Sequence, residues 1–160
     1  MTEEVRVFRA PMRSRDDGVD VAATIARARR CGVCGFGERS VDPDRLERRI
    51  ARFADAPDGS FVWTRDTEGR YWLGRITGDY FYDIDSAATD VDLVHVRPCR
   101  WLPEPLLEPH VPAAVLATYR RGGRNLQQTH DDAVAGQTLR LWDTRRGSVS
   151  ASGPSGNRHR

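Results

Sequence analysis

The sequence has no lysine: all 25 of its basic residues are arginine, set against 23 acidic residues. Arginine binds phosphates through two hydrogen bonds and stacks on bases, so a surface rich in arginine suits nucleic acid. A GC-rich genome produces the same bias wherever a cation is needed, and the many alanine, glycine, aspartate and proline residues favour that explanation. The missing lysine therefore does not by itself indicate a function.

Long apolar runs and an even set of cysteines are also lacking. No stretch approaches the roughly 20 apolar residues that cross a bilayer, and the start, MTEEVRVFRA, has no secretory apolar run. We therefore expect a cytoplasmic protein that does not contact membranes. Three cysteines argue against a disulfide framework. Cys31 and Cys34 have the spacing of a metal or redox pair, but without a second pair we expect core thiols, no metal and no cofactor.

The length fits one domain, residues 1–143, followed by a short tail, residues 144–160. The domain carries 21 arginines and all 23 acids, a net charge of −2, whereas the tail has four arginines and no acid. The tail is rich in glycine and serine and cannot bury enough apolar surface to become ordered. We predict that it is a disordered, solubilising end.

Hydrophobic periodicity predicts an α+β domain. Asp20 and Asp42-Pro43 are helix starts, and Leu46, Ile50 and Phe53 form one apolar helical stripe. An acidic loop is expected at 85–92, and Pro98 should end the last strand. The expected helices cover 21–30, 43–53, 111–119 and 133–142, and the expected strands cover 5–9, 31–36, 61–65, 70–77, 80–83 and 93–97. The order of elements indicates a small antiparallel barrel or curled sheet at the centre.

The segment 61–102 holds three tryptophans, three tyrosines and two phenylalanines. Alternation along 70–78 places Trp72 and Gly74 on one face of a strand, and Tyr71 and Leu73 on the other. Such rings either fill a core or line a slot for a flat ligand, and a planar base is the obvious candidate. Any single ring is more often part of a core than of a ligand site. Among all the rings of this segment, however, we expect at least one to line a site.

Three motifs in this segment carry a family resemblance: Gly-Arg-Ile-Thr-Gly at 74–78, Tyr-x-Tyr at 80–82 and His-Val-Arg-Pro-x-x-Trp at 95–101. Together they resemble the central segment of PUA-like domains, most closely the EVE and YTH-related modules associated with modification-dependent restriction systems. The likeness covers about residues 5–143, although Gly59-Ser60 stands where those modules commonly have Gly-Asp. It implies a barrel of about five or six mainly antiparallel strands flanked by helices.

The resemblance also implies a function: a non-enzymatic module that stacks a modified base of DNA or RNA, flipped out or single-stranded, between aromatic walls. A separate effector, such as a nuclease in bacterial defence, would supply chemistry. The expected base-binding pocket consists of Cys34, Gly35, Phe36, Trp63, Trp72, Gly74, Tyr80 and Trp101. The expected phosphate contacts are Arg75, Arg97, Arg120, Arg121 and Arg124.

Two other functions stay open. The aromatic surface could instead bind a protein partner, in which case affinity would depend little on salt. A small base-processing enzyme is the third hypothesis, with Cys34 or His95 in its site. The sequence has no serine in a nucleophile elbow and no Gly-Lys-Ser/Thr, so catalysis is the least favoured of the three.

Overall fold

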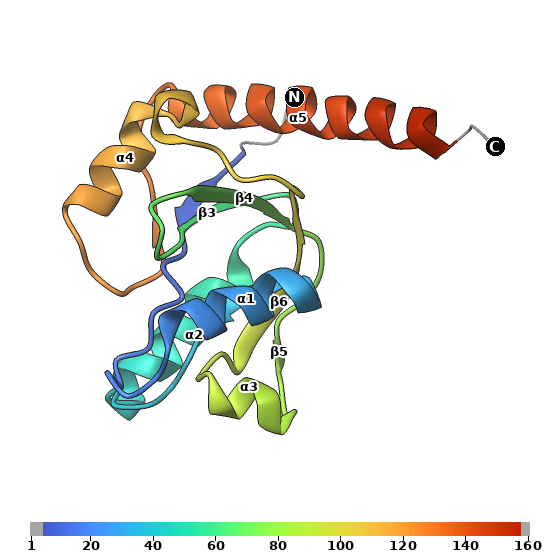
Figure 1. The fold of residues 1–160 in the computed structure, drawn as a ribbon. Helices are drawn as coiled ribbons and strands as arrows, with labels where there is room; N and C mark the ends of the chain where they lie inside the picture. Colours follow the sequence, from blue (N-terminus) through green and yellow to red (C-terminus); the bar gives the residue numbers. More distant parts are fainter. Residues whose placement is uncertain (1–4, 158–160) are drawn as a thin grey trace.

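The computed structural model describes the backbone of residues 5–157 and the side chains of residues 5–146. Within that range a curled sheet lies between two groups of helices (Figure 1). The strands are β1 (Val7–Arg9), β2 (Val33–Phe36), β3 (Phe61–Arg65), β4 (Tyr71–Ile76), β5 (Phe81–Tyr82), β6 (His95–Trp101) and β7 (Gln127–Gln128). The helices are α1 (Val21–Cys31), α2 (Pro43–Asp55), α3 (Ser86–Asp90), α4 (Ala113–Arg120) and α5 (Val134–Asn157), with a 3-10 turn at Glu108–His110.

The strands follow the order β2-β6-β4-β3-β1-β7, and β5 also pairs with β6. Only β1 and β3 pair in parallel among these strands. β6 joins the two halves of the sheet, because its first residues pair with β2 and β5 and its last with β4. Helices α1 and α2 lie on one side, and α4 and α5 on the other (Figure 1). The predicted α+β class with a curled sheet is confirmed.

Helix α2 is built as the sequence predicts. The Asp42 carboxylate accepts a hydrogen bond from the Arg45 backbone N–H at 3.1 Å, and Pro43 occupies the first turn. Leu46, Ile50 and Phe53 all pack into the core, so the predicted apolar stripe is confirmed. The opposite side of the helix is left for its charged residues.

Two predictions around β6 are wrong. The strand continues through Pro98 to Trp101. On one edge of β6, Pro98 pairs with Val33 of β2; on the other edge it lies where β6 passes from β5, which pairs at 95–96, to β4, which pairs at 99–101. Its missing N–H therefore removes no bond from the ladders with β5 and β4. The acidic loop at 85–92 contains the short helix α3, because the Asp85 carboxylate accepts from the Ala87 N–H and starts it.

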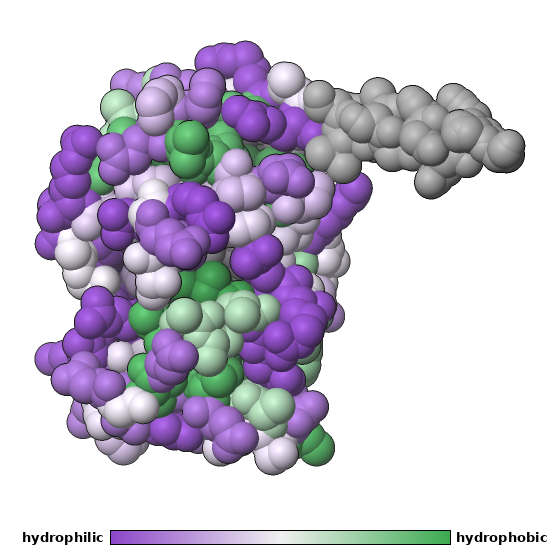
Figure 2. Space-filling view, in the orientation of Figure 1, coloured by the Kyte–Doolittle hydropathy of each residue, from purple (hydrophilic) through white to green (hydrophobic). Residues whose placement is uncertain are grey.

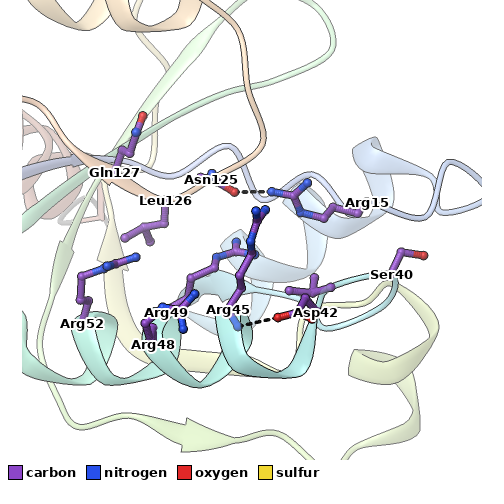
Figure 3. A pocket seen from close by; sticks show the side chains of 11 residues that line it. Arg15, Ser40, Asp42, Arg45, Arg48, Arg49, Arg52, Asn125, Leu126 and Gln127 are labelled. Atoms are coloured by element: carbon purple, nitrogen blue, oxygen red, sulfur yellow. Dashed lines mark hydrogen bonds between the residues drawn. The ribbon is translucent and has the colours of Figure 1, made fainter.

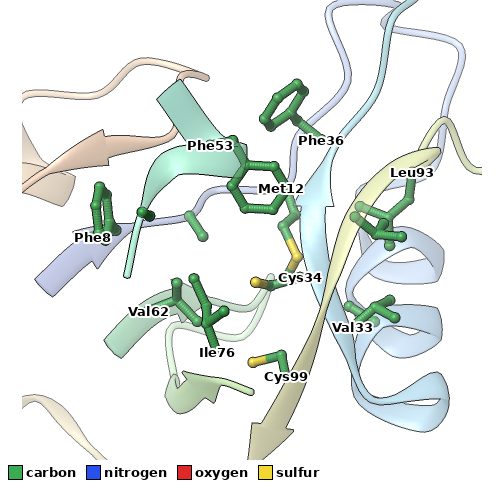
Figure 4. Close-up of a cluster of buried hydrophobic side chains, with 14 of the residues drawn as sticks. Phe8, Met12, Val33, Cys34, Phe36, Phe53, Val62, Ile76, Leu93 and Cys99 are labelled. Atoms are coloured by element: carbon green, nitrogen blue, oxygen red, sulfur yellow. The ribbon is translucent and has the colours of Figure 1, made fainter. Parts of the chain in front are cut away.

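The sheet has a core on each face. Inside the curl, Phe8, Phe53 and Val62 belong to the cluster drawn in Figure 4, where the Cys34 sulfur lies near Met12 and the Cys99 sulfur lies beyond Cys34. The prediction of core thiols is confirmed for Cys34 and Cys99 and wrong for Cys31, which is exposed. The second cluster packs the other face against α4 and α5. Its buried members are Val7, Phe61, Trp63, Tyr71, Leu73, Leu102, Leu106, Val111, Val115, Val134 and Trp142.

The visible face of the molecule is mostly hydrophilic, with apolar side chains in small areas (Figure 2). Among the described residues, no helix combines the length and apolarity needed to cross a membrane. Helix α5 runs on to Asn157, within the segment 144–160 that the sequence predicts to be a disordered tail. Disorder of that tail stays a prediction.

The turn between β3 and β4 depends on the Asp66 carboxylate. Burial alone would raise the pKa of Asp66, but hydrogen bonds from the Trp72 indole, the Arg70 and Glu68 backbone amides and the Arg70 guanidinium hold this pKa below its usual value. A carboxyl with a lowered pKa stabilises the fold above its unfolded pKa of about 4, and this contribution disappears as the pH falls through the folded pKa.

We therefore expect Asp66→Asn to lower the free energy of unfolding by about 1–2 kcal/mol at pH 7 and by much less near pH 2. Urea denaturation across this pH range measures the difference. Glu68→Gln is the matched control, because its side chain is 69% exposed and it should change stability little. A loss of unfolding free energy in Asp66→Asn that is equal at pH 7 and near pH 2 would contradict the stabilising role of the ionised Asp66 carboxylate.

Candidate nucleic-acid interface

Trp63 and Trp72, both expected in the base-binding pocket, lie on opposite faces of the sheet. Trp63 has no exposed area, points toward α5 and donates its indole N–H to Thr138 Oγ1 at 3.3 Å. Trp72 points the other way, donates to Asp66 and is covered by the Arg29 guanidinium 3.5 Å from its ring centroid. The expectation that both belong to one base-binding pocket is wrong, because helices cover both faces of the hairpin.

Gly74 and Trp101, both predicted to line the base-binding pocket, do lie together, but they pack directly against each other. A Cβ on Gly74 would meet Cys99 Sγ at 2.6 Å and the Trp101 ring at 2.7 Å. The half-buried Trp101 donates its indole N–H to the Val33 carbonyl at 3.0 Å. The glycine therefore makes room for this indole, and no space for a base lies between them.

Phe36 and Tyr80 do lie in one aromatic group, together with His95. The ring centroids of Phe36 and His95 are 5.7 Å apart, and Tyr80 Oη hydrogen-bonds with His95 Nδ1 at 2.8 Å. His95 Nε2 contacts Glu38 Oε1 at 2.8 Å, and Tyr82 donates to the other oxygen of that carboxylate. Because both nitrogens of this buried imidazole are engaged, His95 holds the loop after β2 against β5.

The part of the predicted pocket at Cys34 and Gly35 is also filled by the protein. Cys34 has no exposed area, and a Cβ on Gly35 would collide with the His95 carbonyl. The close approach that this glycine permits is therefore that of β6 to β2. Since Cys34 and His95 are both buried, neither offers a free reactive group at the surface in this structure.

Two of the arginines expected to contact phosphates are tied to the protein itself. Arg97 is 2% exposed and donates to the carbonyls of Phe53, Ala56 and Gly78 and to the Asp58 carboxylate, so the expectation of a phosphate contact is wrong there. Arg75 donates to the Gly59 carbonyl and lies over the Phe61 ring, on the side of α5.

The remaining three predicted arginines lie around the end of α4. Arg120 and Arg121 are exposed. Arg124 donates to the Ser14 carbonyl at 2.8 Å and to the Asp17 carboxylate at 2.9 Å. Phosphate binding by these three stays a prediction.

The structure reveals a cleft of about 480 Å³ between α2 and the segment 125–127 (Figure 3). A volume of this size is in the usual range for ligand sites. Its lining consists of Arg15, Ser40, Val41, Asp42, Arg45, Arg48, Arg49, Arg52, Asn125, Leu126 and Gln127. The cleft thus has five arginines and one acid, and the Asp42 carboxylate already caps α2.

A small hollow adjoins the cleft and shares Arg15, Val41 and Arg49 with it. Phe36 and Gly37 line it, and the Arg49 guanidinium lies 4.8 Å from the Phe36 ring centroid. Its volume of about 10 Å³ holds about one water molecule. An aromatic face covered by an arginine therefore lies directly beside the arginine-lined cleft.

The buried Asp92 carboxylate ties the loops around the hollow together. It accepts from Ser14 Oγ at 2.6 Å and from the Glu38 N–H at 2.9 Å, and a Cβ on Gly37 would collide with it. Among the described residues, three that are not glycine have φ between 52° and 59°, in the left-handed region: Met12, Ser40 and Asp92. Backbone in this region is costly and tends to cluster at functional sites, and all three lie in or next to the loops around this hollow.

Comparison with solved structures supports the fold. Over 88% of both chains, the protein superposes with a TM-score of 0.51 and 13% identity on the YTH domain of Zygosaccharomyces rouxii MRB1 in complex with N6-methyladenosine RNA. The Pho92 YTH domain in complex with m6A gives a TM-score of 0.52 and 14% identity over 88% of this chain and 85% of the other. The chain has a YTH-like fold. No protein-family model and no curated protein matches the sequence.

The YTH-like fold confirms the fold implied by the resemblance found in the sequence, while the link to EVE modules and restriction systems stays a prediction. Sequence reasoning missed the cleft. The signal was nevertheless present, because Arg45, Arg48, Arg49 and Arg52 recur at i, i+3, i+4 and i+7, the spacing of one helical face.

Proposed function

We propose that the protein is a non-catalytic nucleic-acid-binding module that recognises a modified base. The observation that carries the proposal is the arginine-lined cleft beside the covered face of Phe36. It lies on a fold shared with two YTH domains whose structures contain N6-methyladenosine or m6A. N6-methyladenosine is therefore the first base to test, in both RNA and DNA.

The base is recognised at the end of β2. The Arg49 guanidinium now covers the Phe36 ring as a stacked cation, and a flat base can take its place when that flexible side chain moves into the cleft. Stacking of a base on an aromatic ring contributes about 1–3 kcal/mol, which offsets the cost of exposing the ring. A separate effector, such as a nuclease in bacterial defence, acts on the nucleic acid bound by this chain.

Phe36→Leu is expected to reduce the preference for the modified oligonucleotide about 5- to 100-fold, because leucine fills the core without offering a ring to stack on. Fluorescence anisotropy with paired oligonucleotides, identical except for one N6-methyladenosine, measures this preference. Affinity for the unmodified strand should change little, because in this proposal only the modified base enters the site at Phe36.

Phe81→Leu is the matched control, since Phe81 is 42% exposed on β5 and does not line the cleft. A wild-type protein without any preference for the modified strand would refute the proposal, as would a folded Phe36→Leu variant that keeps the full preference. Binding to a protein partner with little dependence on salt, and none to nucleic acid, would instead support an interaction module.

A further inference from the structure

The arginines of α2 form a single stripe along the cleft. Arg45 and Arg52 are seven residues apart, about 10 Å along the helix axis, with Arg48 and Arg49 between them. The acidic residues of the same helix, Asp44, Glu47 and Asp55, do not line the cleft. Figure 3 shows the arginine side chains extending from α2 toward the segment 125–127.

These arginines have no carboxylate partner among the described residues. The ion pairs in that part of the chain use other arginines, including Arg27, Arg39 and Arg70. Burial, together with the nearby charges of Arg15 and Arg52, lowers the pKa of Arg49, as expected when like charges crowd together. Because residues 1–143 carry a net charge of −2, this concentration of positive charge is a local feature.

The facing wall consists of the amide side chains of Asn125 and Gln127 with the apolar Leu126 between them, and it carries no acid. Asn125 Oδ1 accepts from Arg15 at 2.7 Å, and Gln127 Oε1 accepts from Arg9 at 2.9 Å. The arginines therefore line the side of a cleft and do not form a protruding ridge that could enter a groove of a duplex. A negatively charged chain thinner than a duplex suits this shape and charge.

We infer that this cleft binds the phosphodiester backbone of a single-stranded nucleic acid, next to the base recognised at Phe36. The inference rests on the proposed function and names its substrate class. The guanidinium groups of Arg45, Arg48 and Arg52 contact successive phosphates, and the amides of the facing wall contact sugars or base edges. The cleft provides affinity for the nucleic acid, and the hollow beside it provides selectivity for the modified base.

The test compares two triple variants of the full chain with the same change in charge. In the first, Arg45, Arg48 and Arg52 are replaced by glutamine, which keeps helix propensity. In the second, Arg30, Arg100 and Arg140 are replaced in the same way; all three are exposed, none is a predicted phosphate contact and none lines the α2 cleft. Anisotropy measures binding to a labelled 12-nucleotide RNA, a DNA of the same sequence and the corresponding duplex, at several salt concentrations.

The α2 triple variant is expected to bind single strands roughly 10- to 100-fold more weakly and to lower the slope of log affinity against log salt by about 2. The second variant should bind like the wild type, and the duplex should bind more weakly than either strand. Tighter binding of RNA or of DNA then identifies the polymer.

Equal losses in both variants, a loss only in the second, or an unchanged salt slope in the first would overturn the inference, as would tighter binding of the duplex. The ratio of the affinities for the modified and the unmodified oligonucleotide distinguishes a failure of this inference from a failure of the proposed function. If the α2 variant binds the modified and the unmodified strand equally weakly and the wild type shows no preference between them, only base recognition fails. If the wild type prefers the modified strand and the α2 variant binds as tightly as the wild type, only the assignment of the cleft fails.

Discussion

Arg97→Met is expected to lower the free energy of unfolding by about 3–5 kcal/mol. The Arg97 guanidinium is almost completely buried and donates to the carbonyls of Phe53 and Ala56, at the end of α2, and of Gly78. Its fourth partner is the Asp58 carboxylate, at 2.7 Å. Methionine fills much of the volume but leaves these carbonyls without a donor, and helix ends depend on such donors for their last carbonyls.

Urea denaturation measures the loss, and Arg100→Met, at an exposed position on the same strand, should change stability by less than about 1 kcal/mol. Lysine at position 97 should rescue only part of the loss, because a compact ammonium cannot reach partners spread around a planar guanidinium. The alternative from the sequence, a phosphate contact, predicts the reverse: normal stability and weaker binding of every oligonucleotide. That result would contradict the structural role.

The sequence predicts correctly those elements that are determined by interactions between residues close together in the chain. Asp42-Pro43 and the stripe of Leu46, Ile50 and Phe53 define α2, because capping and helical periodicity act within a few residues. The hairpin of β3 and β4 follows in the same way from alternation around the turn at 66–69. The continuation of β6 through Pro98 was not predictable, because it depends on which strands pair on either side of that proline.

The candidate site is harder to predict from the sequence, because it too depends on contacts between segments that are far apart in the chain. Alternation correctly separates Trp72 and Tyr71 onto two faces, but it cannot tell that helices cover both of them. The cleft joins α2 to the segment 125–127, about 75 residues later in the chain, so its second wall exists only after folding. Its first wall, the arginine stripe, is visible in the spacing, but in a sequence whose basic residues are all arginine such a stripe is a weak signal.

Trp63→Ala is expected to lower the free energy of unfolding by about 3–5 kcal/mol, because it empties the space of a fully buried indole between β3 and α5 and removes the donor to Thr138. A loss of this size is a large part of the stability of a typical domain. Trp63→Phe, which keeps a ring and most of the packing, is therefore the companion variant, with an expected loss of about 1–2 kcal/mol.

The two variants separate a core residue from a wall of the base site. If Trp63 is core, Trp63→Phe keeps the wild-type preference for the modified strand, and its only measurable change is in unfolding by heat or urea. If Trp63 stacks on the base, Trp63→Ala loses that preference while it unfolds near the wild-type midpoint. Because the structure leaves this indole no exposed area, a base could reach it only if α5 moved away from the sheet, and binding would then make the junction of β3 and α5 more accessible to amide hydrogen exchange.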